Sequence, residues 1–454
     1  MDVRYPTAGS FPISASLSRR NLLRGALAAG LTVPAVPLLT ACGDSAAKTN
    51  DTPGTLSMTA WEAYPEQIRE LLASFKNQGG SPVDLSLIPN VGYGPALQTR
   101  LQGGQAIDVF YNFAYASTKY VDAGWAGTLN DFPGAEDLLA DMFPASAARH
   151  RLADGRIISV PYFSAVHNLM YNESHLKKHG ISAPPTTKEE VYEQCRKLKS
   201  AGVPSPYAGY WTKQFLEEYL LVYLLADGIT PFDDKGAPVF ADDPRTQDVM
   251  EWWKAMYQDG LTSKDVLTAD PGNHVTAMAQ GNSTFFELHH YFLQIVRTTE
   301  GPESGNVTIL YRNPGTAGTT LQIGEVIQIG AKSGGQRAQD AWKLLKFYGW
   351  KDDVGKYSTF TSWAKAAALL GPYPGLFKDP DFLAAFPSYY DMPKLENTFA
   401  NQSDVVPTRV APWYASFQVK VGDRIQAMLL GQADVKETVD ALATDARNLA
   451  AAGQ

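Results

Sequence analysis

Histidine pairs are the side chains of this chain whose spacing could bind a metal ion. His175 and His179 lie four residues apart on a predicted helix, so both could face one side. Metal binding needs a third ligand and a desolvated site, and two lysines lie between these histidines, which favours a solvated helix face. His289 and His290 are adjacent, and adjacent side chains point apart. The sequence therefore predicts no metal site and no cofactor, although either pair could hydrogen-bond a ligand.

The sequence lacks the local motifs of several common catalytic and nucleotide-binding sites. It contains no phosphate loop of the form G-x-x-x-x-G-K-[ST], no G-x-S-x-G nucleophile elbow and no H-E-x-x-H segment. Residues 233–236 lack the downstream glutamate of a calcium loop, so a β-turn is expected there. A Ser/His/Asp triad could still assemble in space, but nothing local argues for one. We expect a protein without catalytic residues.

Cysteine chemistry is the most specific signal in the chain. Cys42 follows Leu-Thr-Ala, and this segment resembles a lipobox, in which the cysteine is lipidated and becomes the mature N-terminus. Arg19 and Arg20 lie upstream in a segment that resembles a twin-arginine export signal. The uncharged stretch 25–41 is shorter than the about 20 residues of a membrane span and contains two prolines. We expect residues 1–41 to be a twin-arginine-type lipoprotein signal peptide and residues 42–54 to be a flexible tether.

The expected export determines the location of the protein and limits the molecules that it can bind. It would be extracytoplasmic and lipid-anchored, in the periplasm or on the outer face of the cell membrane. Only Cys195 would remain in the mature fold, so no disulfide is possible there, and a core position on a helix is expected for it. The net charge is −8 and no basic stripe occurs, which argues against nucleic-acid binding and favours neutral or cationic small molecules.

Alternating strand and helix patterns predict an α/β fold. Strands are expected at 56–60, 83–88 and 106–111, with helices between them at 65–76 and 95–102, and this order is typical of a parallel sheet. Apolar residues at 68, 71, 72 and 75 give the first helix its amphipathic face. Later patterns predict strands at 167–172 and 323–329 and helices at 214–226, 337–349 and 351–359, together with a helix that runs to Ser200 after a Thr187 N-cap.

Several segments in sequence order carry a family resemblance. They are residues 98–109 ending in Asp-Val, 154–161 ending in Val-Pro, 169–190 with its Tyr-Asn and Pro-Pro-Thr, and 411–414 with its Trp-Tyr. From about Leu56 to the end the chain resembles the extracellular solute-binding proteins of family 1, the maltose-binding-protein-like group that serves ABC importers. The resemblance implies a two-lobe periplasmic-binding-protein fold with an interlobe hinge and a ligand cleft.

The implied division places residues 55–164 plus 285–327 in lobe I and 165–284 plus 328–454 in lobe II. The chain would cross between lobes near 162–167, 284–287 and 324–330. The implied function is to capture a sugar or oligosaccharide by lobe closure and deliver it to ABC permease subunits. The protein would be a monomer that meets the membrane only through its lipid anchor. One alternative is a protein of the same fold that binds a polyamine or another small solute. The other is an exported carbohydrate-active enzyme.

Strand ends and crossing segments supply the candidate ligand contacts. Aromatic faces would stack on a pyranose ring, and carboxylate, amide and imidazole groups would bind its hydroxyls. Relatives place stacking aromatics near 207–211 and 413, which the resemblance carries over to this chain. The candidates are Trp61, Glu62, Tyr111, Asn112, His167 (a hinge residue or a contact), Tyr207, Tyr210, Trp211, Glu287, Trp413 and Tyr414.

The ligand class stays open between sugars and cations at this point. Residues 162–167 and 287–291 depart from the pattern of maltodextrin binders, so the expected ligand is not maltose. Glu62, Glu287 and the acidic balance favour a polyamine as the chief competitor.

Overall fold

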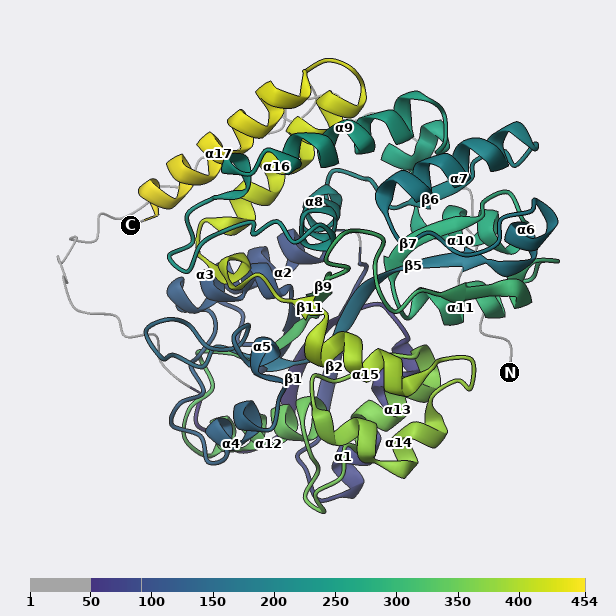
Figure 1. Ribbon diagram of the computed structural model, residues 1–454. Helices are drawn as coiled ribbons and strands as arrows, with labels where there is room; N and C mark the ends of the chain where they lie inside the picture. Colours follow the sequence, from purple (N-terminus) through teal and green to yellow (C-terminus); the bar gives the residue numbers. More distant parts are fainter. Residues whose placement is uncertain (1–49, 91, 454) are drawn as a thin grey trace, which may run out of the picture. The chain divides into compact units, whose positions relative to one another are not determined.

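The computed structural model describes residues 50–90 and 92–453 (Figure 1). The expected signal peptide with Arg19 and Arg20, and the expected lipidation site Cys42, lie outside the described residues. Within the described part, none of the helices combines the length and the apolar character needed to cross a membrane.

The last residues of the expected tether contact the folded chain. The backbone N–H of Asn50 donates to the carbonyl of Lys332 at 2.7 Å. Nη2 of Arg337, near the start of α12 (Gly335–Gly349), donates to the carbonyl of Thr55 at 2.9 Å. These contacts hold Asn50 and Thr55 against the fold, whereas the sequence predicts a flexible tether up to residue 54.

The first sheet is built from the predicted alternation of strands and helices. Its order is β2 (Val83–Ile88), β1 (Leu56–Trp61), β3 (Val109–Asn112), β10 (Val326–Ile329), β4 (Val160–Pro161). Strand β1 pairs in parallel with β2 and β3, whereas β10 runs antiparallel to β3 and β4. The expected strand–helix–strand–helix–strand order at the start of the domain is confirmed.

Helix α1 (Pro65–Asn77) shows why the sequence prediction succeeded there. Its buried residues are Ile68, Leu71, Leu72 and Phe75, the predicted face, and proline at the first helical position is preorganised for the helix. The other helices that follow the first-sheet strands are α2 (Tyr93–Gln102), α3 (Ser117–Asp122), α4 (Ala135–Ala140), α5 (Pro144–Ala147), α12, α13 (Ser358–Ala367), α14 (Pro380–Ala385) and α15 (Met392–Asn401). Helices α12 and α13 pack beside α1 (Figure 1).

The second sheet has the order β11 (Ser403–Asp404), β9 (Thr320–Ile323), β5 (Ala165–Asn172), β7 (Phe285–His289), β6 (Tyr207–Gly209), with β8 (Val307–Ile309) also on β5. Its helices are α6 (Glu173–Lys178), α7 (Lys188–Ser200), α8 (Leu216–Ala226), α9 (Arg245–Gln258), α10 (Pro271–Ala279), α11 (Phe292–Thr298), α16 (Tyr414–Leu429) and α17 (Val435–Ala452). Helices α8, α9 and α16 pack together, and α17 covers α9 and α16 (Figure 1). The predicted Thr187 cap of α7 is confirmed, because its side chain accepts from the Glu190 N–H.

Within the described residues the chain passes between the two sheets three times, twice at short segments and once through the helices between β10 and β11. It leaves the first sheet after β4 and enters the second at β5, and it returns between β9 and β10 through Gly324 and Glu325. The strand predicted over 323–329 is therefore two strands in different sheets. The crossing expected near 284–287 does not occur, because β7 pairs with β5 and β6 inside the second sheet.

Sheet membership differs from the expected lobe division in two places. Strands β7, β8 and β9 belong to the second sheet, whereas the resemblance implies lobe I for residues 285–327. Strand β10 belongs to the first sheet, although residues from 328 onward were assigned to lobe II. The sheet to which each of these strands belongs is decided by antiparallel pairing with strands far away in the sequence. A local sequence pattern carries no information about such pairing. The lobe boundaries themselves stay a prediction.

The helix expected at 351–359 is also displaced. Helix α13 begins at Ser358, and the preceding residues form a turn in which Asp352 accepts from the N–H groups of Val354 and Lys356 at 3.1 and 2.9 Å. An aspartate that bonds nearby backbone N–H groups in this way stabilises a turn at the expense of a helix.

Helix α8 has no solvent-facing side. All of its residues from Leu216 to Ala226 are buried, including Glu217 and Glu218, which are 0% and 8% exposed. A helix that is apolar all round is typical of a protein core, and a carboxylate buried in it needs partners because an unpaired buried charge is costly. These partners come from distant segments and define the site described next.

Candidate ligand-binding site

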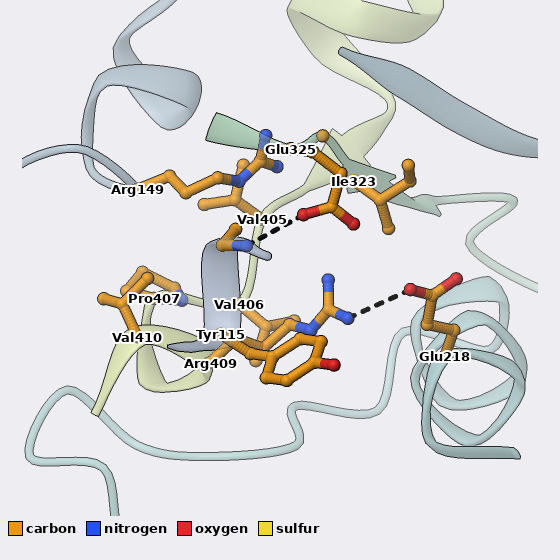
Figure 2. A pocket seen from close by; sticks show the side chains of 12 residues that line it. Tyr115, Arg149, Glu218, Ile323, Glu325, Val405, Val406, Pro407, Arg409 and Val410 are labelled. Atoms are coloured by element: carbon orange, nitrogen blue, oxygen red, sulfur yellow. Dashed lines mark hydrogen bonds and ion pairs between the residues drawn. The ribbon is translucent and has the colours of Figure 1, made fainter. Parts of the chain in front are cut away.

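A small cavity lies where the two sheets are connected (Figure 2). It has a volume of about 10 Å³, roughly the room for one water molecule. Its lining comes from the turn after β3, the loop after α5, helix α8, the β9–β10 crossing and the segment around η6 (Pro407–Val410): Ala114, Tyr115, Arg149, Glu218, Ile323, Gly324, Glu325, Val405, Val406, Pro407, Arg409 and Val410. Polar and charged groups of both signs therefore meet in one enclosed space.

Glu325 belongs to the crossing between β9 and β10. Its Oε2 accepts from the backbone N–H of Ala114 at 2.8 Å (Figure 2). Burial raises the pKa of Glu325 to about 8, although this hydrogen bond and the nearby arginines oppose the rise. At neutral pH the carboxyl is therefore mostly protonated and can donate a hydrogen bond as well as accept one.

Arg149 comes from the loop after α5 and is only 4% exposed. Its Nη2 donates to the carbonyl of Gln322 at 2.7 Å. Burial, together with the positive charge of Arg409, lowers its pKa to about 9. A guanidinium has five N–H donors, so donors beyond the one on Gln322 remain for a molecule in the cavity.

Glycine at position 324 is required by the close approach of the two crossings. A Cβ there would lie 2.2 Å from the carbonyl oxygen of Phe163 and 2.7 Å from Nη1 of Arg149. Contacts that short do not occur between real atoms, so any side chain would push the crossings apart and displace Arg149.

Arg409 is the partner of both glutamates of α8. Its Nε and Nη2 reach the two carboxylate oxygens of Glu217 at 3.1 Å each, and Nη2 also reaches Oε1 of Glu218 at 3.3 Å. The hydroxyl of Tyr414 donates to Glu217 as well, at 2.5 Å. Burial opposes the charged form of Arg409, but the two carboxylates raise its pKa above its usual value.

Two histidines hold the other oxygen of Glu218. Nε2 of His167 on β5 and Nε2 of His289 on β7 each lie 3.1 Å from Oε2 of Glu218. Burial would raise the pKa of Glu218, but these hydrogen bonds hold it well below its usual value. Burial also lowers the pKa of His167 to about 4, so its ring is neutral at physiological pH.

Glu325 makes the stability of the protein depend on pH. Its folded-state pKa of about 8 exceeds the ordinary value of 4.5, so the folded state binds more protons between these values. The stability that it contributes is fully present below about pH 4.5 and is lost as the pH rises through 8.

We expect Glu325→Gln to show a smaller fall in the free energy of unfolding from about pH 5 to about pH 9 than the native protein, as measured by urea unfolding. Glu62→Gln, at an exposed carboxyl, is the control and should leave the profile unchanged, and identical profiles for native protein and Glu325→Gln would contradict the assignment.

The aromatic candidates of the first sheet form a core cluster. The ring of Trp61 packs against those of Tyr93, Tyr111 and Tyr162, and Tyr111 is fully buried. Nδ2 of Asn112 donates to Gln328 on β10 at 2.7 Å, inside the sheet. Glu62 is exposed.

The candidates of the second sheet are buried in a separate polar and aromatic network. The Tyr207 hydroxyl donates to Oε2 of Glu287, and Asn313 donates to the other oxygen of that carboxyl at 3.3 Å. Trp211 is fully buried, and Tyr210 is half-buried against Phe215.

Trp413 is half-buried and packs against Phe232 and Phe417. Of the sequence candidates, His167 bonds to Glu218 of the cavity lining, and Tyr414 bonds to the neighbouring Glu217. None of the candidates lines the cavity itself, and their part in ligand contact stays a prediction.

The cavity residues that sequence reasoning missed carried a partial signal. Glu217 and Glu218 interrupt an otherwise apolar helical stretch, and Glu325 interrupts an apolar strand pattern. Charged residues in such positions are rarely buried without a partner or a function. Arg149 and Arg409 carried no comparable local signal, since Arg149 lies in a turn and Arg409 in the short helix η6.

Comparison of the sequence with known proteins identifies the family of the chain. The sequence model of the bacterial extracellular solute-binding proteins matches residues 59–349 of the chain. The chain belongs to this family. Membership in an extracellular family places the chain outside the cytoplasm. Among its relatives is the erythritol/L-threitol-binding protein of Mycolicibacterium smegmatis, 23% identical over 287 residues, and the match spans 54% of this chain and 60% of the relative.

Solved structures of solute-binding proteins share the fold. The maltose-bound MalE3 of T. maritima has a TM-score of 0.74 at 21% identity, covering 87% of this chain and 100% of that chain. A solute-binding protein of Agrobacterium radiobacter K84 in complex with ribitol has a TM-score of 0.73 at 18% identity, covering 88% and 100%. The expected two-lobe α/β fold of periplasmic binding proteins is thus confirmed.

Proposed function

We propose that this protein is the extracytoplasmic substrate-binding component of an ABC importer and that it captures a sugar, an oligosaccharide or a related polyol. The observation that carries the proposal is the cavity at the sheet connection, where Arg149, Arg409, Glu218 and Glu325 present donors and acceptors side by side (Figure 2). A polyhydroxyl solute needs both kinds of partner, because each hydroxyl donates and accepts. The relatives named for maltose, ribitol and erythritol support the same ligand class.

The cavity is too small for a sugar as it stands. With about 10 Å³ of room, its walls must move apart to admit a solute and return to enclose it. The crossing segments at Gly324 and near Phe163 are the places where a hinge would act, since they connect the two sheets. Closure buries the polar groups, so a solute that lacks one matching hydroxyl leaves a partner unpaired and is rejected.

A polyamine fits the described residues less well. Glu62 is exposed and lies outside the cavity lining, and Glu287 is occupied by Tyr207 and Asn313. Of the carboxyls that do line the cavity, Glu218 is bound by Arg409 and two histidines, and Glu325 is mostly protonated at neutral pH. Arg149 in the same wall would repel an ammonium group.

A thermal-shift screen tests the function directly. The mature protein is heated with panels of monosaccharides, oligosaccharides, polyols and polyamines, and each well is analysed for products. We expect one group of sugars or polyols to raise the melting temperature by several degrees, because a ligand stabilises the state that it binds. A rise with polyamines alone would overturn the ligand class, and product formation would make the protein an enzyme.

The anchoring of the protein follows from the expected lipobox and export signal. Lipidation at Cys42 would hold the domain at the membrane surface beside the permease, and Arg19 and Arg20 would direct export of the folded protein. We expect Cys42→Ser to move the protein from the membrane fraction to the soluble fraction, while Cys195→Ser, at a buried thiol, leaves it in the membrane fraction. Membrane association that persists in Cys42→Ser would rule out a lipid anchor at this residue.

A further inference from the structure

Three side chains from three separate elements converge beside the cavity. His167 lies on β5 and His289 on β7, and the two residues are register partners in the antiparallel ladder. Directly opposed residues point to the same face of a sheet, so both rings lie on one side, 4.5 Å apart between centroids. Glu218 of α8 reaches the same place, and the ligating atoms of all three residues lie within 4.8 Å of one another.

We propose that His167, Glu218 and His289 bind a divalent transition-metal ion, for which Zn²⁺ is the best match. Imidazole nitrogen and carboxylate oxygen are ligands that zinc prefers, with bonds of about 2.0–2.2 Å. Tetrahedral bonds of that length separate neighbouring ligand atoms by about 3.3 Å. Both Nε2 atoms lie 3.1 Å from Oε2 of Glu218, so small shifts would place a metal ion among the three atoms.

The surroundings orient one of the two histidines as a metal ligand, whereas Nδ1 of the buried His167 has no hydrogen-bond partner among the described residues. Nδ1 of His289 lies 3.0 Å from the Tyr291 hydroxyl, and a hydrogen bond at the second ring nitrogen is what orients a metal-binding histidine. Arg409 contacts Oε1 of Glu218 and leaves Oε2 to the histidines. All three ligating residues are buried, with 0%, 8% and 6% exposure for His167, Glu218 and His289, so ligands and ion would exchange little with water.

The charge balance permits an added cation. Arg409 lies close to the site, but its charge is offset by the two-point contact with Glu217. Glu218 then remains as the carboxylate that faces the ion. A set of two histidines and one carboxylate leaves coordination positions open for water or another oxygen ligand.

This inference departs from the sequence expectation of no metal site. The sequence placed His289 beside His290, whose ring instead reaches the carbonyl of Ala368 at 3.1 Å. The true partner of His289 is the cross-strand His167, which only the register of β5 and β7 reveals. Because Glu218 also lines the cavity, an ion bound here would be coupled to solute binding.

Metal titration of the intact mature protein tests the inference without any solute. The protein is stripped with a chelator and titrated with Zn²⁺ in a calorimeter, and with Co²⁺ while visible absorption is recorded. We expect one ion per chain, and a visible cobalt band typical of nitrogen and oxygen ligands in tetrahedral geometry. His289→Gln and His167→Gln should each weaken the affinity at least about 100-fold, because each removes one of three protein ligands.

A matched variant separates the site from general effects of histidine removal. His274→Gln changes another buried histidine, outside the triad, and should leave the affinity unchanged. Melting temperatures without metal show which variants remain folded, and X-ray absorption at the zinc edge of the native protein reports two imidazole ligands. The inference is overturned if the folded native protein binds no Zn²⁺, or if His289→Gln and His167→Gln bind it as tightly as His274→Gln does.

Discussion

Arg409→Met is expected to lower the free energy of unfolding by about 3–5 kcal/mol. The side chain joins η6 to helix α8 through a two-point contact with Glu217, which is fully buried. Removal of the guanidinium leaves that carboxylate in the protein interior, where the Tyr414 hydroxyl at 2.5 Å is its remaining side-chain donor among the described residues. Burial already raises the pKa of Glu217, so without Arg409 this carboxyl must either carry the cost of its lost hydration or take up a proton on folding. Urea unfolding at neutral pH measures the difference.

Two further variants show whether the loss of stability comes from the buried unpaired charge or from the loss of an ion pair as such. Lys213→Met removes a pair with Asp423 in which both side chains are about half exposed, and it should cost less than about 1 kcal/mol. Combining Arg409→Met with Glu217→Leu should recover part of the lost stability, because Glu217 no longer leaves a buried carboxylate unpaired and Glu218 keeps its hydrogen bonds to His167 and His289. Equal losses for Lys213→Met and Arg409→Met would contradict this account of the buried pair.

Arg149→Met is expected to weaken binding of the solute about 10- to 100-fold for each hydrogen bond that the guanidinium makes to it. The side chain is buried at the cavity and is held in place by the Gln322 carbonyl, so its orientation is fixed before the solute arrives. A fixed donor loses little conformational entropy on binding, which makes its removal costly. Calorimetric titration with the solute found in the thermal-shift screen measures the change.

Arg151→Met is the matched control for this prediction. Arg151 lies two residues away, is 36% exposed and pairs with Glu136 rather than with the cavity. It should leave the affinity unchanged, and the melting temperature of each variant without solute shows whether it is folded. An Arg149→Met protein that binds as tightly as the Arg151→Met protein would remove Arg149 from the ligand site.

Local sequence pattern was sufficient for the elements whose structure is decided locally. The apolar spacing of α1 and the Thr187 cap of α7 depend on residues within one or two helical turns, and both predictions are confirmed. The position of β7 depends on pairing with β5, more than a hundred residues away, and the sequence expectation for it differed from the structure. Residues 323–329 were expected to form one strand for the same reason, because their apolar pattern is local whereas the pairing that separates β9 from β10 is with distant strands.

The cavity was the part least accessible to sequence reasoning. Arg149 meets Gln322 across 173 positions of the sequence, and Arg409 meets Glu217 across 192. The sequence predicts aromatic residues at strand ends as sugar contacts; Trp61 and Tyr111 pack into the core, where large apolar rings contribute most by burial, and their part in ligand contact stays a prediction. The informative signal was instead the pair of glutamates in the apolar helix α8.

A crystal structure of the protein with its solute tests the central claim most directly. The solute is the one that gives the largest thermal shift, and the structure is compared with that of the unliganded protein. The account predicts solute density in an enlarged cavity, within hydrogen-bond distance of Arg149 and Glu325 at the crossing between the sheets. Density at another place, such as the face of Trp413, with the cavity still closed around its charged residues, would contradict it.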